Sequence, residues 1–159
     1  ARRNRRTVWR ERGTGWTKQS WEEPQRKRLI NSNKKGKRGE LAAAKHLQSL
    51  GFEGARRTVQ YQGAGSIGDV SVPSLPHLSL EIKIGRQCKF GAWLEATIAK
   101  AEADCGDRYP VVLWKCQGSS LWLLSWREDD TIETVFRDVD KAVTLRRLNF
   151  AHEQKKGSL

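Results

Sequence analysis

With 159 residues the chain is long enough to bury one hydrophobic core, and its 30 Lys and Arg against 18 Asp and Glu give it a net charge of +12. It contains no run of 18 apolar residues and no signal-peptide pattern, so we expect no membrane partner. The three cysteines, Cys88, Cys105 and Cys116, lack CxxC spacing. This disfavours a zinc site and predicts free thiols in the cytoplasm, which would be the host's cytoplasm if a phage encodes the chain.

The positive charge is concentrated in the first 38 residues, which hold 14 basic and three acidic residues, whereas the rest of the chain holds 16 and 15. We therefore expect residues 1–33 to form a cationic arm, which favours a polyanionic partner. Trp9, Trp16 and Trp21 are interleaved with its arginines and could either stack on bases or pack on the body or a partner subunit. The residues predicted to contact DNA are Arg2, Arg3, Arg5, Arg6, Arg10, Lys34, Lys35, Lys37 and Arg38.

The segment 39–51 is predicted to be a helix that follows the basic run 34–38 and ends at Gly51. Glu40 lies on the apolar stripe of this helix, and an inward-facing carboxylate is costly unless something pairs with it. Glu40 either complements the helix dipole or serves as a ligand for a metal or water, and we favour the ligand. His46 lies beside the stripe and is expected at the surface. The stripe itself consists of Ala43, Ala44, Leu47 and Leu50.

Residues 52–62 are expected to form a first strand, with Arg56 and Arg57 at its start and with Val59 and Tyr61 on one face. The glycine-rich run 63–68 follows, and it is not a dinucleotide fingerprint because no GxGxxG opens a helix here. Its glycines would let the backbone approach a phosphate, to which Ser66 could donate a hydrogen bond. The alternative is a loop that only connects two strands.

Residues 66–83 are predicted to form a β-hairpin, because apolar and polar residues alternate on both sides of a turn that contains two prolines. If the apolar residues share one face, Val70 lies near Leu80, and Asp69 then lies opposite or diagonal to Glu81 on the other face. Lys83 follows two residues along. Two carboxylates suit Mg²⁺ or Mn²⁺, and a neighbouring lysine can contact a phosphate or orient water. The alternative is a sheet surface with ordinary solvated charges.

The rest of the chain predicts a helix over 91–104 and two strands, 110–115 and 120–126, joined by a turn. The tail from 130 is expected to hold a short helix and a basic, polar end. We therefore divide the chain into an arm (1–33), a core (34–126) and a C-terminal extension (127–159). The expected fold class is α/β, with a mixed central sheet flanked by helices.

Three segments, "KGKRGELAAAKHLQSLGF", "GAGSIGDV" and "LSLEIK", stand in an order that resembles the PD-(D/E)XK nuclease superfamily. Within it they resemble the archaeal-type Holliday junction resolvases and their phage relatives. The similarity covers about residues 34–115, and Gly68 stands where the motif has a proline. The resemblance implies a restriction-endonuclease-like core, and it carries the site over to Glu40, Ser66, Asp69, Glu81 and Lys83.

This resemblance implies hydrolysis of phosphodiester bonds in branched DNA by a homodimer with Mg²⁺ or Mn²⁺. Asp69, Glu81, the Ile82 carbonyl and Glu40 would hold the metal, while Lys83 would orient water or balance charge. Three hypotheses remain open: a junction endonuclease, another nuclease of the superfamily such as a restriction or repair enzyme, and a nucleic-acid-binding module without catalysis.

Overall fold

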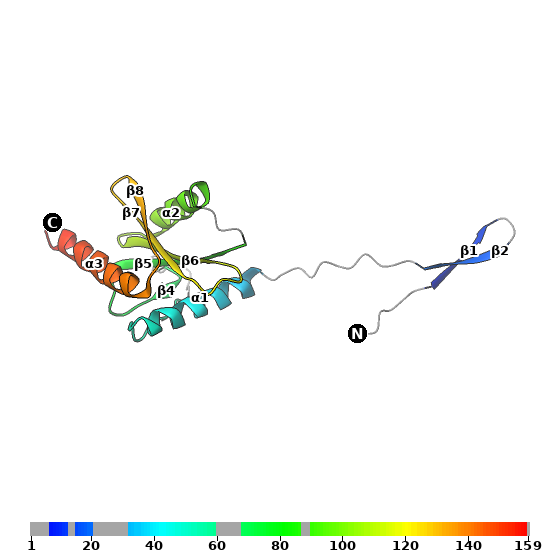
Figure 1. Cartoon of the computed structure of the whole chain (residues 1–159), viewed down its shortest axis with the longest axis horizontal. Coiled ribbons are helices and arrows are strands. Elements are labelled where there is room, and N and C mark those ends of the chain that lie inside the picture. Colours follow the sequence, from blue (N-terminus) through cyan, green and yellow to red (C-terminus); the bar gives the residue numbers. More distant parts are fainter. Residues whose placement is uncertain (1–6, 13–14, 21–31, 60–67, 87–89, 159) are drawn as a thin grey trace. The chain divides into compact units, whose positions relative to one another are not determined.

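The computed structural model describes residues 7–12, 15–20, 32–59, 68–86 and 90–158, with the backbone alone for the first two ranges and for residues 32–33. The chain forms two compact units, residues 1–31 and 32–159 (Figure 1). In the first unit, strands β1 (Thr7–Arg12) and β2 (Gly15–Ser20) pair antiparallel, with Trp9 opposite Lys18. The sequence pattern had predicted no strands in this segment. Four of its predicted DNA contacts, Arg2, Arg3, Arg5 and Arg6, lie outside the described residues.

The second unit is an α/β fold built on a six-stranded open sheet of order β3-β4-β5-β6-β7-β8. Only β5 and β6 run parallel, so the sheet is mixed, as the sequence predicts. The strands are β3 (Arg56–Arg57), β4 (Val70–Ser71), β5 (Leu78–Gly85), β6 (Tyr109–Cys116), β7 (Leu123–Glu128) and β8 (Thr131–Val135).

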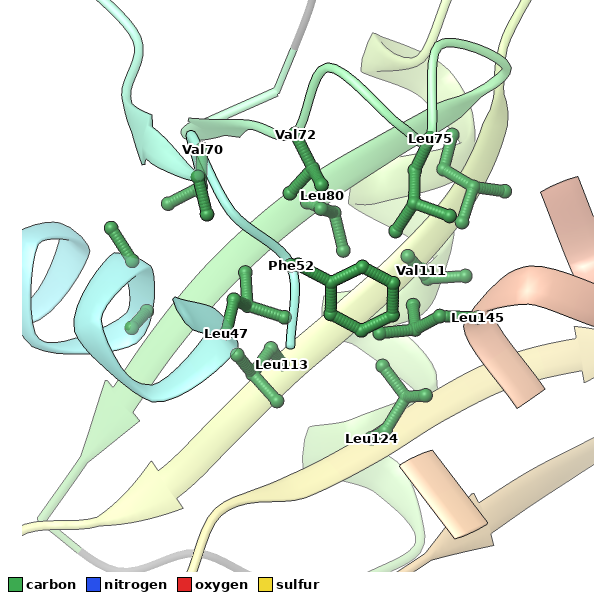
Figure 2. Close-up of a cluster of buried hydrophobic side chains, with 14 of the residues drawn as sticks. Leu47, Phe52, Val70, Val72, Leu75, Leu80, Val111, Leu113, Leu124 and Leu145 are labelled. Atoms are coloured by element: carbon green, nitrogen blue, oxygen red, sulfur yellow. The ribbon is translucent and has the colours of Figure 1, made fainter. Parts of the chain in front are cut away.

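Three helices cover the two faces of this sheet: α1 (Ser32–Ser49), α2 (Ala92–Asp104) and α3 (Asp138–Gly157). Side chains of α1 and α3 share one buried cluster with the sheet, and Figure 2 shows the Phe52 ring among Leu47, Val111 and Leu145 in it. Leu94, Ile98 and Ala101 of α2 pack in a second cluster. The second cluster includes Val112 and Trp114 of β6, whereas the first includes Val111 and Leu113. Because neighbouring strand residues point to opposite faces, α2 covers the face away from α1 and α3.

The end of α1 confirms the predicted role of Gly51. This glycine has φ 92°, a left-handed conformation that side chains with a Cβ rarely adopt. Its N–H donates to the Gln48 carbonyl at 3.0 Å, and the Phe52 N–H donates to the Leu47 carbonyl at 3.1 Å. This pair of bonds is a Schellman motif, and it turns the chain so that Phe52 and Leu47 both enter the core.

Three sequence-based expectations for secondary structure are wrong. The helix expected over 39–51 begins at Ser32, so the basic run 34–38 lies inside α1 and Glu40 is not in its first turn. The strand expected over 52–62 is only two residues long, and Val59 is 61% exposed, so it lies on no buried face; Tyr61 lies outside the described residues. The C-terminal extension holds a sixth strand, β8, and the 20-residue helix α3 rather than a short helix. Both elements join the same sheet or core as the predicted central region, so residues 127–158 complete the fold.

No helix among the described residues has both the length and the apolar composition that crossing a bilayer requires. Cys105 and Cys116 are free thiols, and Cys88 lies outside the described part of the chain.

The expectation that His46 is a surface residue is also wrong. Its side chain is only 15% exposed and stacks on the Trp122 ring, with 5.8 Å between the ring centroids. Lys141, itself buried, places its ammonium 3.2 Å from His46 Nε2, 2.7 Å from the Trp122 carbonyl and 2.9 Å from Asp138 Oδ1. An ammonium can only donate, so His46 Nε2 must accept, which requires the neutral imidazole.

This contact predicts that the protein loses stability in mild acid. Burial, and then the positive charge of Lys141, lower the pKa of His46 below its ordinary 6.5, while Asp138 opposes the shift. A lowered pKa gives stability that is present above pH 6.5 and is lost as the pH falls through the folded-state value. Thermal melting at pH 7.5 and pH 5.5 measures this loss, and His46→Gln, which keeps an acceptor but does not titrate, should show a smaller difference. An equal difference in both proteins would contradict the role of His46.

Candidate active site

The predicted hairpin is present, and its register places Asp69 beside Glu81. Val70 is the register partner of Leu80 in the antiparallel pair β4–β5, as the apolar alternation predicts. The Asp69 N–H donates to the Leu80 carbonyl at 2.8 Å, and the Asp69 carbonyl accepts from Thr58 N–H at 2.9 Å. Hydrogen bonds to Leu80 and Thr58 therefore hold the backbone of Asp69, which fixes the position from which its side chain extends.

Gly68 explains why the position before Asp69 holds no proline. Its φ is 84°, whereas the proline ring fixes φ near −65°. A Cβ added at Gly68 would lie 2.6 Å from both the backbone nitrogen and the carbonyl oxygen of Leu80. Only glycine therefore lets β5 pass this closely and bring Asp69 into register.

The carboxyl groups of Asp69 and Glu81 interact directly. Asp69 Oδ2 accepts a hydrogen bond from the Ile82 N–H at 2.9 Å, which directs the side chain across β5. Burial is the main cause that raises the pKa of Glu81 to about 7, and the charge of Asp69 and a hydrogen bond with it add to the shift. Two carboxylates that resist being charged together form a site that a cation would stabilise.

Lys83 lies on the same face of β5 as Glu81, two residues further along the strand, and is exposed. The residues that pair with Glu81 and Lys83 in β6 are Val112 and Trp114, which pack under α2. Lys100 and Asp104 near the end of α2 are close enough to act on the charge of Glu81. The site therefore lies on the α2 face of the sheet, near the end of α2.

Glu40 does not join this pair in the structure. It lies in the middle of α1, half-buried, and forms an ion pair with Arg57 of β3. Within the described residues, no group of three or more His, Cys, Asp or Glu side chains is close enough to hold a metal ion. Ser66, the other predicted member, lies outside the described part of the chain.

The residues present nevertheless fit a magnesium-type ion. Mg²⁺ keeps several waters and binds proteins through one or two carboxylates together with substrate phosphates, so a pair is sufficient. Within a strand the N–H and C=O of one residue point to the same side, so the Ile82 carbonyl faces the side on which Asp69 accepts the Ile82 N–H. Asp69, Glu81 and the Ile82 carbonyl would hold the ion.

The raised pKa of Glu81 predicts that metal binding and proton loss are coupled. In the metal-free protein, a folded-state pKa of about 7 against an ordinary 4.5 means that stability is fully present below pH 4.5 and is lost as the pH rises through 7. A metal binds the carboxylate, so adding Mg²⁺ at pH 6 should release a proton. Titration in weakly buffered solution measures the release, and Asp69→Asn should reduce it. Absence of proton release while Mg²⁺ binds would exclude Glu81 as a ligand.

Part of the basic surface predicted for DNA lies near the end of β5. Lys34, Lys37 and Arg38 of α1 are exposed, and Lys35 donates a hydrogen bond to Gln117 Oε1 at 2.9 Å. A Cβ at Gly39 would lie 2.9 Å from the end of the Ile84 side chain, so α1 passes close to β5 here. The basic start of α1 therefore lies beside β5, on the face of the sheet opposite to the one that carries Glu81 and Lys83.

Sequence reasoning missed two features of the site. Arg57 was placed at the start of a strand, but its role as the partner of Glu40 was not predicted. The position of Trp114 beside Lys83 was also missed, because it depends on the parallel pairing of β5 with β6. Comparison with known proteins yields no matching family model, no similar curated protein and no similar solved structure.

Proposed function

We propose that this chain is a metal-dependent endodeoxyribonuclease that cuts phosphodiester bonds in four-way DNA junctions. The observation that carries the proposal is the Asp69–Glu81 pair, in which burial and mutual repulsion raise the pKa of Glu81 to about 7. Lys83 follows on the same face. A pair of carboxylates with a lysine two residues further along a strand is the arrangement that the PD-(D/E)XK motif describes.

Each residue of the candidate site would have its own role in hydrolysis. Asp69, held by the Ile82 N–H, and Glu81 would bind the ion and so fix the scissile phosphate beside them. Bound Mg²⁺ or Mn²⁺ supplies Lewis-acid polarisation of the phosphate and lowers the pKa of a bound water. The Lys83 ammonium would orient the attacking water or balance the negative charge that develops on the phosphate. Glu40 pairs with Arg57 on the face of the sheet that α1 covers, so it would take part only after α1 rearranges.

The order α1, β3, β4, β5, α2, β6 supports the finer assignment to a restriction-endonuclease-like fold. Glu40 on α1, and Asp69, Glu81 and Lys83 on the β4–β5 hairpin, are on the elements where that superfamily carries its site residues. A homodimer is part of the proposal, because cutting a junction into two duplexes needs two symmetric incisions. A two-fold axis would place two equal sites on one assembly.

One observation favours a second candidate, a DNA-binding module without catalysis. Glu40 is engaged by Arg57, and the described residues contain no third acidic side chain near Asp69 and Glu81 that would complete a metal cluster. Under this hypothesis the carboxylate pair is structural and the basic residues alone contact DNA.

The test compares three labelled substrates of equal length: a four-way junction, a linear duplex and a single strand. With Mg²⁺ the junction should be cut symmetrically and much faster than the other two. Equal cutting of junction and duplex would instead indicate another nuclease of the superfamily. Binding without any cutting in Mg²⁺ or Mn²⁺ would favour the second candidate.

The basic N-terminal unit leads to a further prediction. Deleting residues 1–31 removes ten basic and three acidic residues, a loss of seven net positive charges. Each phosphate that a basic side chain neutralises releases about one counterion, so junction binding should weaken and its dependence on salt should become shallower. Salt titrations of the full chain and the truncated chain measure both effects. An unchanged slope with a lower melting temperature or a split dimer would mean that the tryptophans pack this unit on protein.

A further inference from the structure

A hollow of about 460 Å³ opens on the α2 face of the sheet, between the start of α2 and strand β8. Phe90, Leu94 and Glu95 line it from the side of α2, and Ile132 and Thr134 line it from β8. Its volume lies within the roughly 300–1,000 Å³ that small-molecule sites occupy. None of its lining residues belongs to the Asp69–Glu81 site.

Buried side chains hold the Phe90 ring, which lines the hollow, in place. The Trp114 indole N–H donates to Ser125 Oγ at 2.9 Å, and that hydroxyl lies 2.7 Å from the Thr134 hydroxyl. Trp114 contacts the Phe90 ring edge-on, with 5.4 Å between the centroids, and the Phe136 ring centroid lies 6.4 Å from that of Phe90. Phe90 is nevertheless 58% exposed. An exposed aromatic ring fixed by a buried one offers a flat surface that loses little conformational freedom when a ligand stacks on it.

The hollow shares a face with the candidate active site. Trp114, which supports Phe90, is the register partner of Lys83 in the parallel pair β5–β6. From β5 to β8 the sheet advances by three strands, about 14 Å at the usual spacing of strands. A DNA strand rises about 3.4 Å per nucleotide, and α2 packs on β6 and β7 between the two sites, so a strand anchored at Asp69 and Glu81 would pass around α2 and reach the hollow after more than about four nucleotides.

We propose that this hollow binds the base of an unpaired nucleotide, displaced from the DNA strand that is cut. The inference rests on the proposed function, since it places the hollow on the path of the same strand. Phe90 would stack on the base, as aromatic side chains do in proteins that bind single strands. Glu95 Oε1 accepts a hydrogen bond from Arg127 at 2.5 Å, and a carboxylate has further acceptor capacity for an exocyclic amine of the base.

Charge favours a nucleotide over an apolar peptide or a second copy of this chain. Arg86 directly follows β5 and is exposed, and Arg137 directly follows Phe136 with its side chain 81% exposed. Arg137 thus adjoins Phe136 in the sequence, and Arg86 stands four residues before Phe90. The two guanidinium groups would contact phosphates on either side of a stacked base, whereas a second copy would bring the same positive charges against them.

The experiment measures binding of a single-stranded oligonucleotide and of a junction in Ca²⁺, so that no cutting is needed. Phe90→Ala should weaken both affinities about five- to hundredfold, the usual effect of losing one stacked base. Phe90→Trp should retain them. Phe150→Ala is the matched control, because Phe150 is an equally exposed phenylalanine (60%) on α3 and does not line the hollow, so binding should be unchanged. Melting temperatures verify that the variants are folded.

An abasic scan then identifies the nucleotide. Removing one base at a time should weaken binding by the wild-type chain at a single position, and the same abasic strand should cause no further loss in Phe90→Ala. Equal affinities of Phe90→Ala and Phe150→Ala, or a loss that is the same at every position, would overturn the proposal. So would a change of oligomeric state in Phe90→Ala with normal DNA binding, since the hollow would then be a protein interface. These results do not depend on cutting, so failure of the proposed nuclease activity is scored separately.

Discussion

Replacing Asp69 by asparagine or Glu81 by glutamine should slow cutting of a four-way junction by at least about a thousandfold. Loss of a metal ligand removes several kcal/mol of charge stabilisation in the transition state, and each 1.4 kcal/mol corresponds to about a tenfold change in rate. Binding of the junction should be retained or improved, because the basic surface remains and one negative charge beside the phosphate is removed. Single-turnover cutting in Mg²⁺ and gel-shift affinity in Ca²⁺ measure the two effects.

Both variants should fold normally, so a loss of cutting would report on the active site and not on folding. Glutamine resembles the protonated form of Glu81, which a pKa of about 7 already favours in the metal-free protein near pH 6. Asparagine keeps an oxygen that can accept the Ile82 N–H. Asp104→Asn is the matched control, since Asp104 is an exposed carboxylate that acts on the charge of Glu81 from α2 and is no proposed ligand. Near-normal cutting by either site variant, or an equal loss in Asp104→Asn, would remove Asp69 and Glu81 from the active site.

Replacing Gly68 by alanine should lower the melting temperature far more than the same change at Gly118. Both glycines have nearly the same φ, 84° and 85°, so both substitutions carry a similar backbone cost of about 1 kcal/mol. Around Gly118 nothing lies within 4 Å of an added Cβ, whereas at Gly68 the backbone of Leu80 lies at 2.6 Å. Backbone atoms of a paired strand cannot move aside cheaply, so we expect a total loss of about 3 kcal/mol or more.

Thermal melting of the two variants measures this difference of about 2 kcal/mol or more, which corresponds to at least roughly 4–8 °C for a chain of this size. The clash also displaces Asp69 from β5, so Gly68→Ala should cut poorly even at temperatures where it stays folded. Equal melting temperatures for the two variants would mean that Gly68 and β5 can move apart without a loss of stability. The close approach of Gly68 to β5 would then not position Asp69.

The hairpin could be predicted from the sequence because its physics is local. Alternation of apolar and polar residues fixes the register of a strand, since a slip of one residue would place Asp69 and Glu81 in the core. The observed pairing of Val70 with Leu80 follows from that constraint. The metal, the substrate and the superfamily remain predictions.

Helix α3 could not be predicted in this way, because polar residues occupy half of its buried stripe. Its buried positions, 141, 144, 145 and 148, have regular helical spacing, but two of them hold Lys141 and Thr144. Lys141 is tolerated there because its ammonium finds partners in His46, Asp138 and the Trp122 carbonyl. Those partners come from distant parts of the chain as well as from α3, so the sequence pattern carries little sign of them.

The same reason limits prediction of the site's surroundings. The ion pair of Glu40 with Arg57 depends on how α1 packs against β3, and the hollow near Phe90 depends on β8 closing the sheet beside α2. Neither contact lies between neighbours in the sequence. The strand expected over 52–62 is longer than the observed β3, Arg56–Arg57. Two adjacent polar residues give no alternation of apolar and polar side chains from which its limits could be predicted.

The most direct test of the central claim starts cutting by adding metal. The full chain is bound to a labelled four-way junction in EDTA, and excess Mg²⁺ is then added. We predict no cutting in EDTA or in Ca²⁺, and symmetric cutting of the junction once Mg²⁺ is in excess, with Mn²⁺ able to replace it. Full cutting in EDTA, or no cutting of the bound junction in either Mg²⁺ or Mn²⁺, would contradict the account.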